Sequence, residues 1–151
     1  HTAYRRQRQM CIRDSEWEKH GTIGAVARDS FGNIAAGTST GGITNQMPGR
    51  VGDSPLPGCG TYANNDSVAI SCTGIGEAFV KEVAAHQVSD RVLYAKEEPV
   101  EAAKAALDGV ARHHGDGGMI VVPAHGEGAM VFNSEMMNCG WKSPKGSYVQ
   151  S

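Results

Sequence analysis

Two short runs of this chain are apolar at successive positions rather than at alternate ones. They are Ile23–Ala27 and Met119–Val122. A strand with this pattern needs cover on both faces of its sheet, whereas a strand with one solvated face alternates. The helices that this chain can supply cover one face only. We therefore expect the other face to show exposed Ile, Val and Ala, and expect the missing cover to come from a segment upstream of this chain.

Apolar periodicity predicts the element order β-β-β-α-α-β-β. The strands are expected at about residues 22–29, 33–39, 67–72, 117–122 and 128–133, and the helices at about 77–90 and 98–113. The stretch "DSFGN" predicts a hairpin turn between the first two strands, and the final "GSYVQS" suggests a short edge strand. Strands and helices come in blocks, which favours an α+β fold with one antiparallel sheet and both helices on one face.

Composition excludes several classes of protein. The 151 residues carry a formal net charge of −2, which does not favour binding to nucleic acid or to an anionic membrane. No run approaches the roughly 18 apolar residues that a membrane span needs. The four cysteines, Cys11, Cys59, Cys72 and Cys139, form no CxxC pair. They favour free thiols in a reducing compartment, which we take to be the cytoplasm, and argue against a zinc site.

The first fifteen residues, "HTAYRRQRQMCIRDS", show no apolar period. Their arginines could form a basic arm for nucleic acid, but "RRQRQMCIRDS" resembles a translated sequencing-adapter remnant. We therefore interpret residues 1–15 as a non-native or disordered segment.

Threonines stand at the ends of three predicted strands. Thr22 directly precedes the first apolar run, Thr40 ends the second strand, and Thr73 ends the third. Antiparallel pairing should bring Thr22 close to Thr40, and Thr73 could join them. A threonine at a strand end most often caps a turn. Similarly, Arg50 and Asp53, three apart in the Gly- and Pro-rich segment 41–66, could be a surface ion pair of little consequence.

Four motifs taken together are more specific. They are "GTIGAVARD", "NIAAGTSTGG", "MPGRVGDSPLPGCGTYANN" and "SCTGIGE", and they occur in this order from Gly21 to Glu77. They resemble the β subunit of the plant-type asparaginases, N-terminal-nucleophile (Ntn) hydrolases that include the isoaspartyl peptidases. The resemblance implies a four-layer αββα sandwich shared by α and β subunits in an (αβ)₂ assembly. Residues 22–151 would be the β-subunit domain, supplying one antiparallel sheet and its two covering helices, and residues 16–21 would end the linker before it.

The resemblance also implies catalytic roles. The precursor would cut itself between Gly21 and Thr22, which gives Thr22 a free α-amine to act as base for its own hydroxyl. Thr40 would orient this nucleophile. The hydroxyl of Thr73 and the N–H of Gly74 would form the oxyanion hole.

Substrate recognition would depend on Arg50, Asp53 and Gly76. L-asparagine and β-aspartyl peptides carry an α-carboxylate, which suits the planar fork of Arg50, and an α-ammonium, which suits Asp53. We expect both side chains to face Thr22 across a gap sized for one amino acid. We expect no cofactor and no metal ligand in this chain. The expected partners are a small-molecule substrate and the α subunit, with no nucleic acid and no membrane.

Neighbouring families are alternatives. Glycosylasparaginases share "IAAGTST" and "PGRVGDSP", but Gly41 and "TGIGE" favour the asparaginases. Threonine aspartases usually lack an acid at the Asp53 position. Met136 stands where the family normally has glycine, which predicts an altered turn there. A non-catalytic fragment that acts only as an assembly partner is a further alternative.

Overall fold

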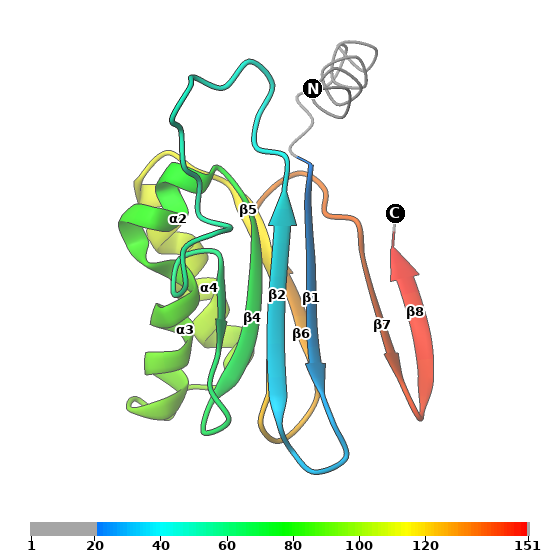
Figure 1. The fold of residues 1–151 in the computed structure, drawn as a ribbon. Coiled ribbons are helices and arrows are strands. Elements are labelled where there is room, and N and C mark those ends of the chain that lie inside the picture. The colour runs from blue at the N-terminus through cyan, green and yellow to red at the C-terminus, as the bar shows by residue number, and fades with distance from the viewer. Residues whose placement is uncertain (1–20, 151) are drawn as a thin grey trace.

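The computed structural model describes residues 21–150, so the interpretation of residues 1–15, and of 16–20 within the linker, lies outside the described residues. Strands and helices alternate in blocks along the chain, as expected (Figure 1). The elements are β1 (Thr22–Arg28), β2 (Ile34–Thr40), β3 (Thr61–Ala63), β4 (Val68–Gly74), α2 (Gly76–Glu82), α3 (Ala84–Leu93), α4 (Pro99–Arg112), β5 (Gly117–Pro123), β6 (Ala129–Phe132), β7 (Cys139–Ser143) and β8 (Gly146–Gln150).

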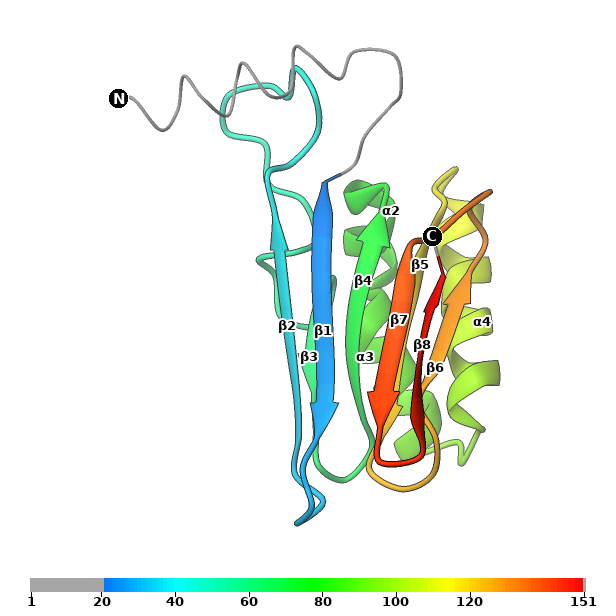
Figure 2. The same ribbon diagram turned by 90° about the vertical axis from the view of Figure 1, so that its right-hand side faces the viewer.

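The strands form three separate antiparallel sheets rather than the one sheet that we expected. The largest has the order β3-β4-β5-β6, and β1-β2 and β7-β8 are two-stranded hairpins. The three helices lie on one face of the four-stranded sheet, and the β1–β2 hairpin lies on its other face (Figures 1 and 2). The expectation of a mixed α and β fold with antiparallel strands and the helices on one face is confirmed. The single sheet was wrong because β1 and β2 stack on β4 instead of pairing with it.

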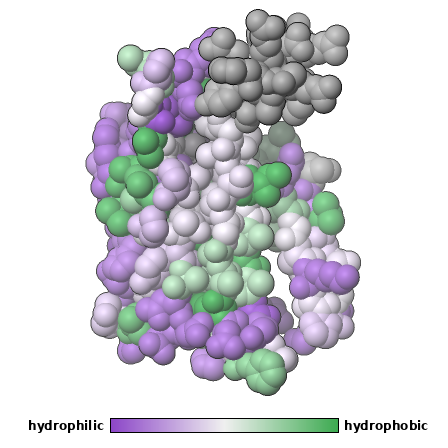
Figure 3. Space-filling view, viewed as in Figure 1, coloured by the Kyte–Doolittle hydropathy of each residue, from purple (hydrophilic) through white to green (hydrophobic). Residues whose placement is uncertain are grey.

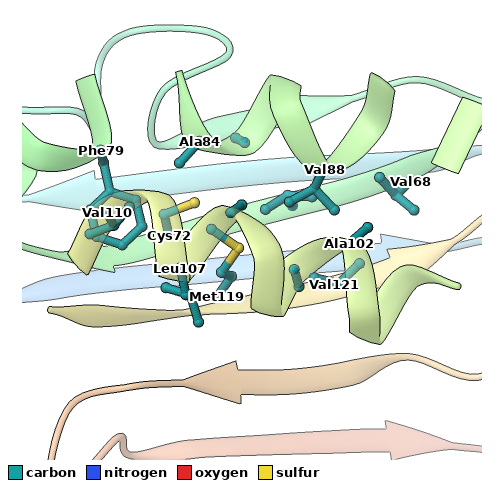
Figure 4. Close-up of a cluster of buried hydrophobic side chains, with 14 of the residues drawn as sticks. Val68, Cys72, Phe79, Ala84, Val88, Ala102, Leu107, Val110, Met119 and Val121 are labelled. Atoms are coloured by element: carbon teal, nitrogen blue, oxygen red, sulfur yellow. The ribbon is translucent and has the colours of Figure 1, made fainter. Parts of the chain in front are cut away.

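The hydrophobic core lies between the helices and strands β4 and β5 (Figure 4). Its residues come from these five elements: Val68, Ile70, Cys72, Ala78, Phe79, Ala84, Ala85, Val88, Ala102, Ala103, Ala106, Leu107, Val110, Met119 and Val121. The small residues of α4 face the sheet, so the helix can pack closely against β5 and β6. This core fixes β4, whose end carries two of the predicted site residues.

The second face of β4 is not bare, contrary to our expectation. Five of its seven residues are buried, among them Ala69 and Ser71, because the β1–β2 hairpin covers the face that the helices leave open. The exposure falls on β1 instead, where Ile23 is 76% exposed and Ala25 and Ala27 are also exposed. Figure 3 shows this weakly hydrophobic surface in the middle of the molecule.

The predicted helix over 77–90 is broken at Val83. This residue has φ 51° and ψ 46°, in the left-handed region, and it separates α2 from α3. The break frees the first N–H groups of α3, and those of Ala85 and His86 donate to the carbonyls of Cys59 and Gly58. The interruption therefore docks the glycine-rich loop onto α3. Periodicity missed it because the apolar pattern continues through the break.

Two strands were not predicted. β3 has only three residues and lies in the glycine-rich segment, and β7 follows Met136, a residue that is 68% exposed. β7 pairs with β8, so the expected terminal strand is confirmed as one half of a hairpin.

The turn between β1 and β2 forms where "DSFGN" predicted it. The Asp29 carboxylate accepts the backbone N–H groups of Phe31 at 2.9 Å and Asn33 at 2.8 Å, and Gly32 supplies a φ of +91°. The side-chain amide of Asn33 also donates to this carboxylate, at 2.9 Å. This bond is the main reason why the pKa of Asp29 lies below its usual value, and the backbone hydrogen bonds act in the same direction. The turn sets the register of the hairpin, and thereby the partner of Thr22.

Candidate active site

Thr22 and Thr40 lie directly opposite each other at the open end of the hairpin, as expected. The hydroxyl of Thr22 donates to that of Thr40 at 3.2 Å, and the same Thr40 oxygen accepts the N–H of Gly42 at 3.0 Å. Thr40 is therefore held by the turn that follows it and presents a fixed acceptor to Thr22.

The end of β4 reaches the same end of the molecule as the start of β1 (Figure 2). Two cavities meet at Thr22. The first holds about 10 Å³ and is lined by Thr22, Thr40, Gly42, Ile43, Arg50, Gly52, Asp53, Ser54 and Gly74. The second holds about 100 Å³ and is lined by Thr22, Gly24, Ser71, Cys72, Thr73, Gly118, Ile120, Met137, Asn138, Cys139 and Gly140. Between them, the two cavities are lined by all four predicted catalytic residues, and the first is also lined by Arg50 and Asp53.

The first cavity differs from expectation in size. Arg50 and Asp53 do line it together with Thr22, but about 10 Å³ is room for about one water molecule and not for an amino acid. Arg50, Asp53 and Thr22 thus share one cavity, which is smaller than an amino acid, and their part in binding a substrate stays a prediction.

Arg50 forms an ion pair with Glu77, which was not among the predicted site residues. Its Nε and Nη2 donate to the two carboxylate oxygens of Glu77 at 2.6 and 3.1 Å. This forked ion pair raises the pKa of Arg50. Only 14% of the Arg50 side chain is exposed. Glu77 closes the motif "TGIGE", three residues after Gly74, and that position at the start of a helix was the signal available in the sequence.

Asp53 is 5% exposed, and its Oδ2 has no hydrogen-bond partner among the described residues. Burial raises the pKa of this carboxyl, although its backbone hydrogen bonds and the charge of Arg50 act in the opposite direction. Asp53 lines the first cavity, and its Oδ2 is an acceptor without a donor among the described residues, which is the state expected of a group that binds a cation or an N–H donor.

Gly76 does not line either cavity. A Cβ on it would lie 2.8 Å from Oδ1 of Asp53, so the missing side chain makes room for the carboxylate. Its part in substrate binding stays a prediction.

Gly74 must be glycine for two reasons. Its φ is +141°, and a Cβ would collide with the carbonyl oxygen of Asp116, which directly precedes β5. The backbone of β4 can therefore approach the first cavity closely at this point. Its role in an oxyanion hole stays a prediction, as does that of Thr73.

Burial disfavours the thiolate forms of Cys59 and Cys72. Burial raises the pKa of Cys72 well above its usual value, and it raises that of Cys59 as well. Cys59, Cys72 and Cys139 are all free. Within residues 21–150, no three His, Cys, Asp or Glu side chains gather closely enough to hold a metal ion. No helix in this part of the chain is long and apolar enough to cross a membrane.

Comparison with known proteins defines the class. Residues 2–149 match the family model Asparaginase_2, described as asparaginase. The chain belongs to this family, which confirms the resemblance drawn from its motifs.

Individual relatives are named as peptidases and asparaginases. The chain is 50% identical to the isoaspartyl peptidase of Salmonella typhimurium over 127 residues, which cover 83% of this chain and 41% of that protein. It is 48% identical to the isoaspartyl peptidase of Escherichia coli over 83% of this chain and 40% of that protein. It is also 42% identical to a plant-type L-asparaginase of Pyrobaculum calidifontis, over 82% of this chain and 42% of that protein. The chain thus spans about two fifths of the length of these relatives.

Proposed function

We propose that this chain is part of an amidohydrolase that cleaves the side-chain amide of L-asparagine or of β-aspartyl peptides. Thr22 is the nucleophile, freed by cleavage after Gly21. The observation that carries the proposal is that the hydroxyl pair of Thr22 and Thr40 shares one cavity with Arg50 and with Asp53, whose Oδ2 lacks a partner among the described residues. The names of the relatives support the same activity.

The proposed chemistry needs only groups that this chain supplies. Once Thr22 is N-terminal, its α-amine, with an ordinary pKa near 8, takes the hydroxyl proton as Oγ attacks the amide carbon. The proton passes to the leaving nitrogen, the C–N bond breaks, and ammonia or an amino acid departs. Water then hydrolyses the Thr22 ester, which releases aspartate and restores the hydroxyl.

The developing oxyanion would be stabilised by the hydroxyl of Thr73 and the N–H of Gly74. A single donor of this kind contributes about 3 kcal/mol in other enzymes. Thr40, which already accepts the Gly42 N–H, would keep the Thr22 hydroxyl pointed at the carbonyl carbon.

Glu77 determines which edge of the Arg50 guanidinium could bind the substrate. It binds Arg50 through Nε and Nη2, whereas Nη1 has only a 3.5 Å contact with Gln46. The Nη1 edge is thus available for an α-carboxylate while Glu77 fixes the plane of the guanidinium. Asp53 then accepts from the α-ammonium, which gives its Oδ2 the partner that it lacks.

We further propose that the chain forms one half of an αββα sandwich, completed by the α subunit. The 76% exposure of Ile23 supports this, because a strand apolar at successive positions needs cover on its outer face. The chain's share of its relatives, 41% in the first comparison, leaves ample length for such a subunit.

The test uses the complete gene product that carries this chain. Intact-mass measurement should find cleavage between Gly21 and Thr22 without added protease. Thr22→Ala should abolish cleavage and hydrolysis, and Thr22→Ser should retain part of both. Activity is assayed on asparagine, a β-aspartyl dipeptide and glycosylated asparagine. An uncleaved but fully active wild-type protein would rule out the mechanism, and a preference for glycosylated asparagine would reassign the substrate.

A further inference from the structure

The β1–β2 hairpin touches β4 through a chain of hydroxyl groups that the proposed chemistry does not use. Thr38 Oγ1 lies 2.6 Å from Ser71 Oγ and 3.2 Å from the carbonyl oxygen of Gly60. Ser71 is 3% exposed, Gly60 is buried and Thr38 is half-buried, so access of water to these groups is restricted. A hydrogen-bonded polar contact in such a place specifies one relative position, because any shift leaves a buried polar group unpaired.

The direction of the chain follows from its last member. A carbonyl oxygen cannot donate, so Thr38 must give its single hydroxyl proton to Gly60, and Ser71 must then donate to Thr38. Gly60 O also accepts the N–H of Cys72 at 2.8 Å. The three segments that carry Thr38, Gly60 and Ser71 are therefore joined at one point, although they lie up to 33 residues apart in sequence.

The two sheets approach each other closely at Gly24, beside this contact. Gly24 is opposite Thr38 in the hairpin register, and a Cβ on it would collide with the Ser71 hydroxyl. The absence of a side chain at Gly24 thus allows Thr38 to reach Ser71.

Each segment joined here also carries part of the candidate site. Thr38 precedes Thr40 by two residues on β2, and Ser71 precedes Thr73 by two on β4, so each pair lies on one face of its strand. Gly60 packs against Asp53, because a Cβ on Gly60 would lie 2.6 Å from Oδ2 of Asp53.

We propose that Thr38 is a positioning residue for the reaction. Its hydroxyl fixes the strand pair that carries the nucleophile against the strand that carries the oxyanion donors, with Gly60 holding the loop of Asp53 in the same unit. The inference rests on the proposed function, because it is alignment at Thr22 that Thr38 would govern. A displacement of about 1 Å between reacting groups can cost 100-fold in rate.

The experiment compares variants of the complete gene product, with kcat expressed per cleaved subunit. Thr38→Val keeps the shape of the side chain and removes the hydroxyl. It should lower kcat about 10- to 100-fold and change KM less than fivefold. Thr38→Ser should restore kcat to within about threefold of wild type, since it retains the donor and acceptor. Ser30→Ala is the control, because Ser30 is exposed in the turn at the end of the hairpin away from Thr22, and its kcat should equal that of wild type.

A double-mutant cycle tests whether the hydroxyls act as a unit. If they do, Thr38→Val combined with Ser71→Ala should lower kcat about as much as Thr38→Val alone, and not by the product of the two single effects. If Thr38→Val does not fold, Ser71→Ala tests the same inference, because it should lower kcat by itself.

Several results would overturn the inference. A normal kcat in Thr38→Val, even with a reduced melting temperature, would leave Thr38 a purely structural residue. A multiplicative cycle would show that the hydroxyls act independently. Failure of the proposed function gives a different result. The wild-type protein would then show no hydrolysis that depends on Thr22, and the inference about Thr38 would fall with the proposed function.

Discussion

The carboxylate of Asp53 occupies a position that costs the folded protein stability. It is 5% exposed, its Oδ2 is unpaired among the described residues, and burial raises its pKa. An unsatisfied buried polar group costs about 1–3 kcal/mol. A group kept at such a cost suits a site that gains its partner only when a ligand binds.

Asp53→Asn should therefore make the unliganded protein more stable at pH 7, by about 1 kcal/mol. The pKa of Asp53 is higher in the folded state than in the unfolded state, where it is near 3.9. Between these two pKa values the folded state binds more protons, so the stability of the wild-type protein falls as pH rises. The advantage of the variant should shrink as pH falls towards 3.9. Urea unfolding at pH 7 and pH 4 measures both effects. An equal difference at the two pH values would contradict this account.

Arg50→Lys keeps the charge but loses the fork that Glu77 grips at two points. We expect KM for asparagine to rise about 10-fold or more, and the rate of cleavage after Gly21 to stay near that of wild type. The scissile peptide bond has no free carboxylate for Arg50 to bind. Steady-state kinetics and the time course of intact mass give the two values. Wild-type KM in the variant would mean that Arg50 serves only its ion pair with Glu77.

At the scale of helices and strands, the break between α2 and α3 is a clear error of the sequence-based prediction, which expected one continuous helix. Val83 is β-branched and lies at φ 51°, a region that costs such residues about 1–2 kcal/mol. The break lets Ala85 and His86 donate to the loop at 58–59, so the strain is offset by contacts made elsewhere. Helical periodicity cannot detect this, because the compensation comes from a distant loop.

Val83→Asn should raise the melting temperature by a few degrees, because Asn tolerates the left-handed region and Val83 is 45% exposed. Val100→Asn is the matched control, since Val100 is 38% exposed but lies within regular helix α4. It should lower the melting temperature or leave it unchanged. Equal responses of the two variants would mean that Val83 is not strained.

For the molecule as a whole, the decisive feature is that β4 is covered on both faces and β1 is not. The helices and the β1–β2 hairpin enclose β4, while Ile23 on the outer layer stays 76% exposed. The layers are complete on the helical side and open on the other (Figures 1 and 2).

Hydrogen exchange should separate the two regions. In a fragment of residues 21–151, amides of β1 should exchange much faster than those of β4 and β5, because their layer is open to water. In the complete gene product, β1 should become as protected as β4. Mass spectrometry of peptides from the two proteins gives the comparison. Fast exchange of β1 in both would show that nothing covers this face.

The local part of the structure was predictable. The Asp29 turn, the register of the hairpin and the 3.2 Å contact between Thr22 and Thr40 all arise within a segment of about twenty residues. Turn chemistry and strand alternation act over that range, so sequence patterns determine them. The family was also predictable, because its four motifs are themselves local.

Only the tertiary structure decided how these segments meet. The hairpin stacks on β4, where Thr38 contacts Ser71, 33 residues away in sequence. The ion pair of Arg50 with Glu77 spans 27 residues, and neither residue signals the other in the sequence. Burial is likewise a property of everything that surrounds a side chain. The motif therefore singled out Asp53, but no local pattern showed that its carboxyl is buried or that its Oδ2 lacks a partner among the described residues.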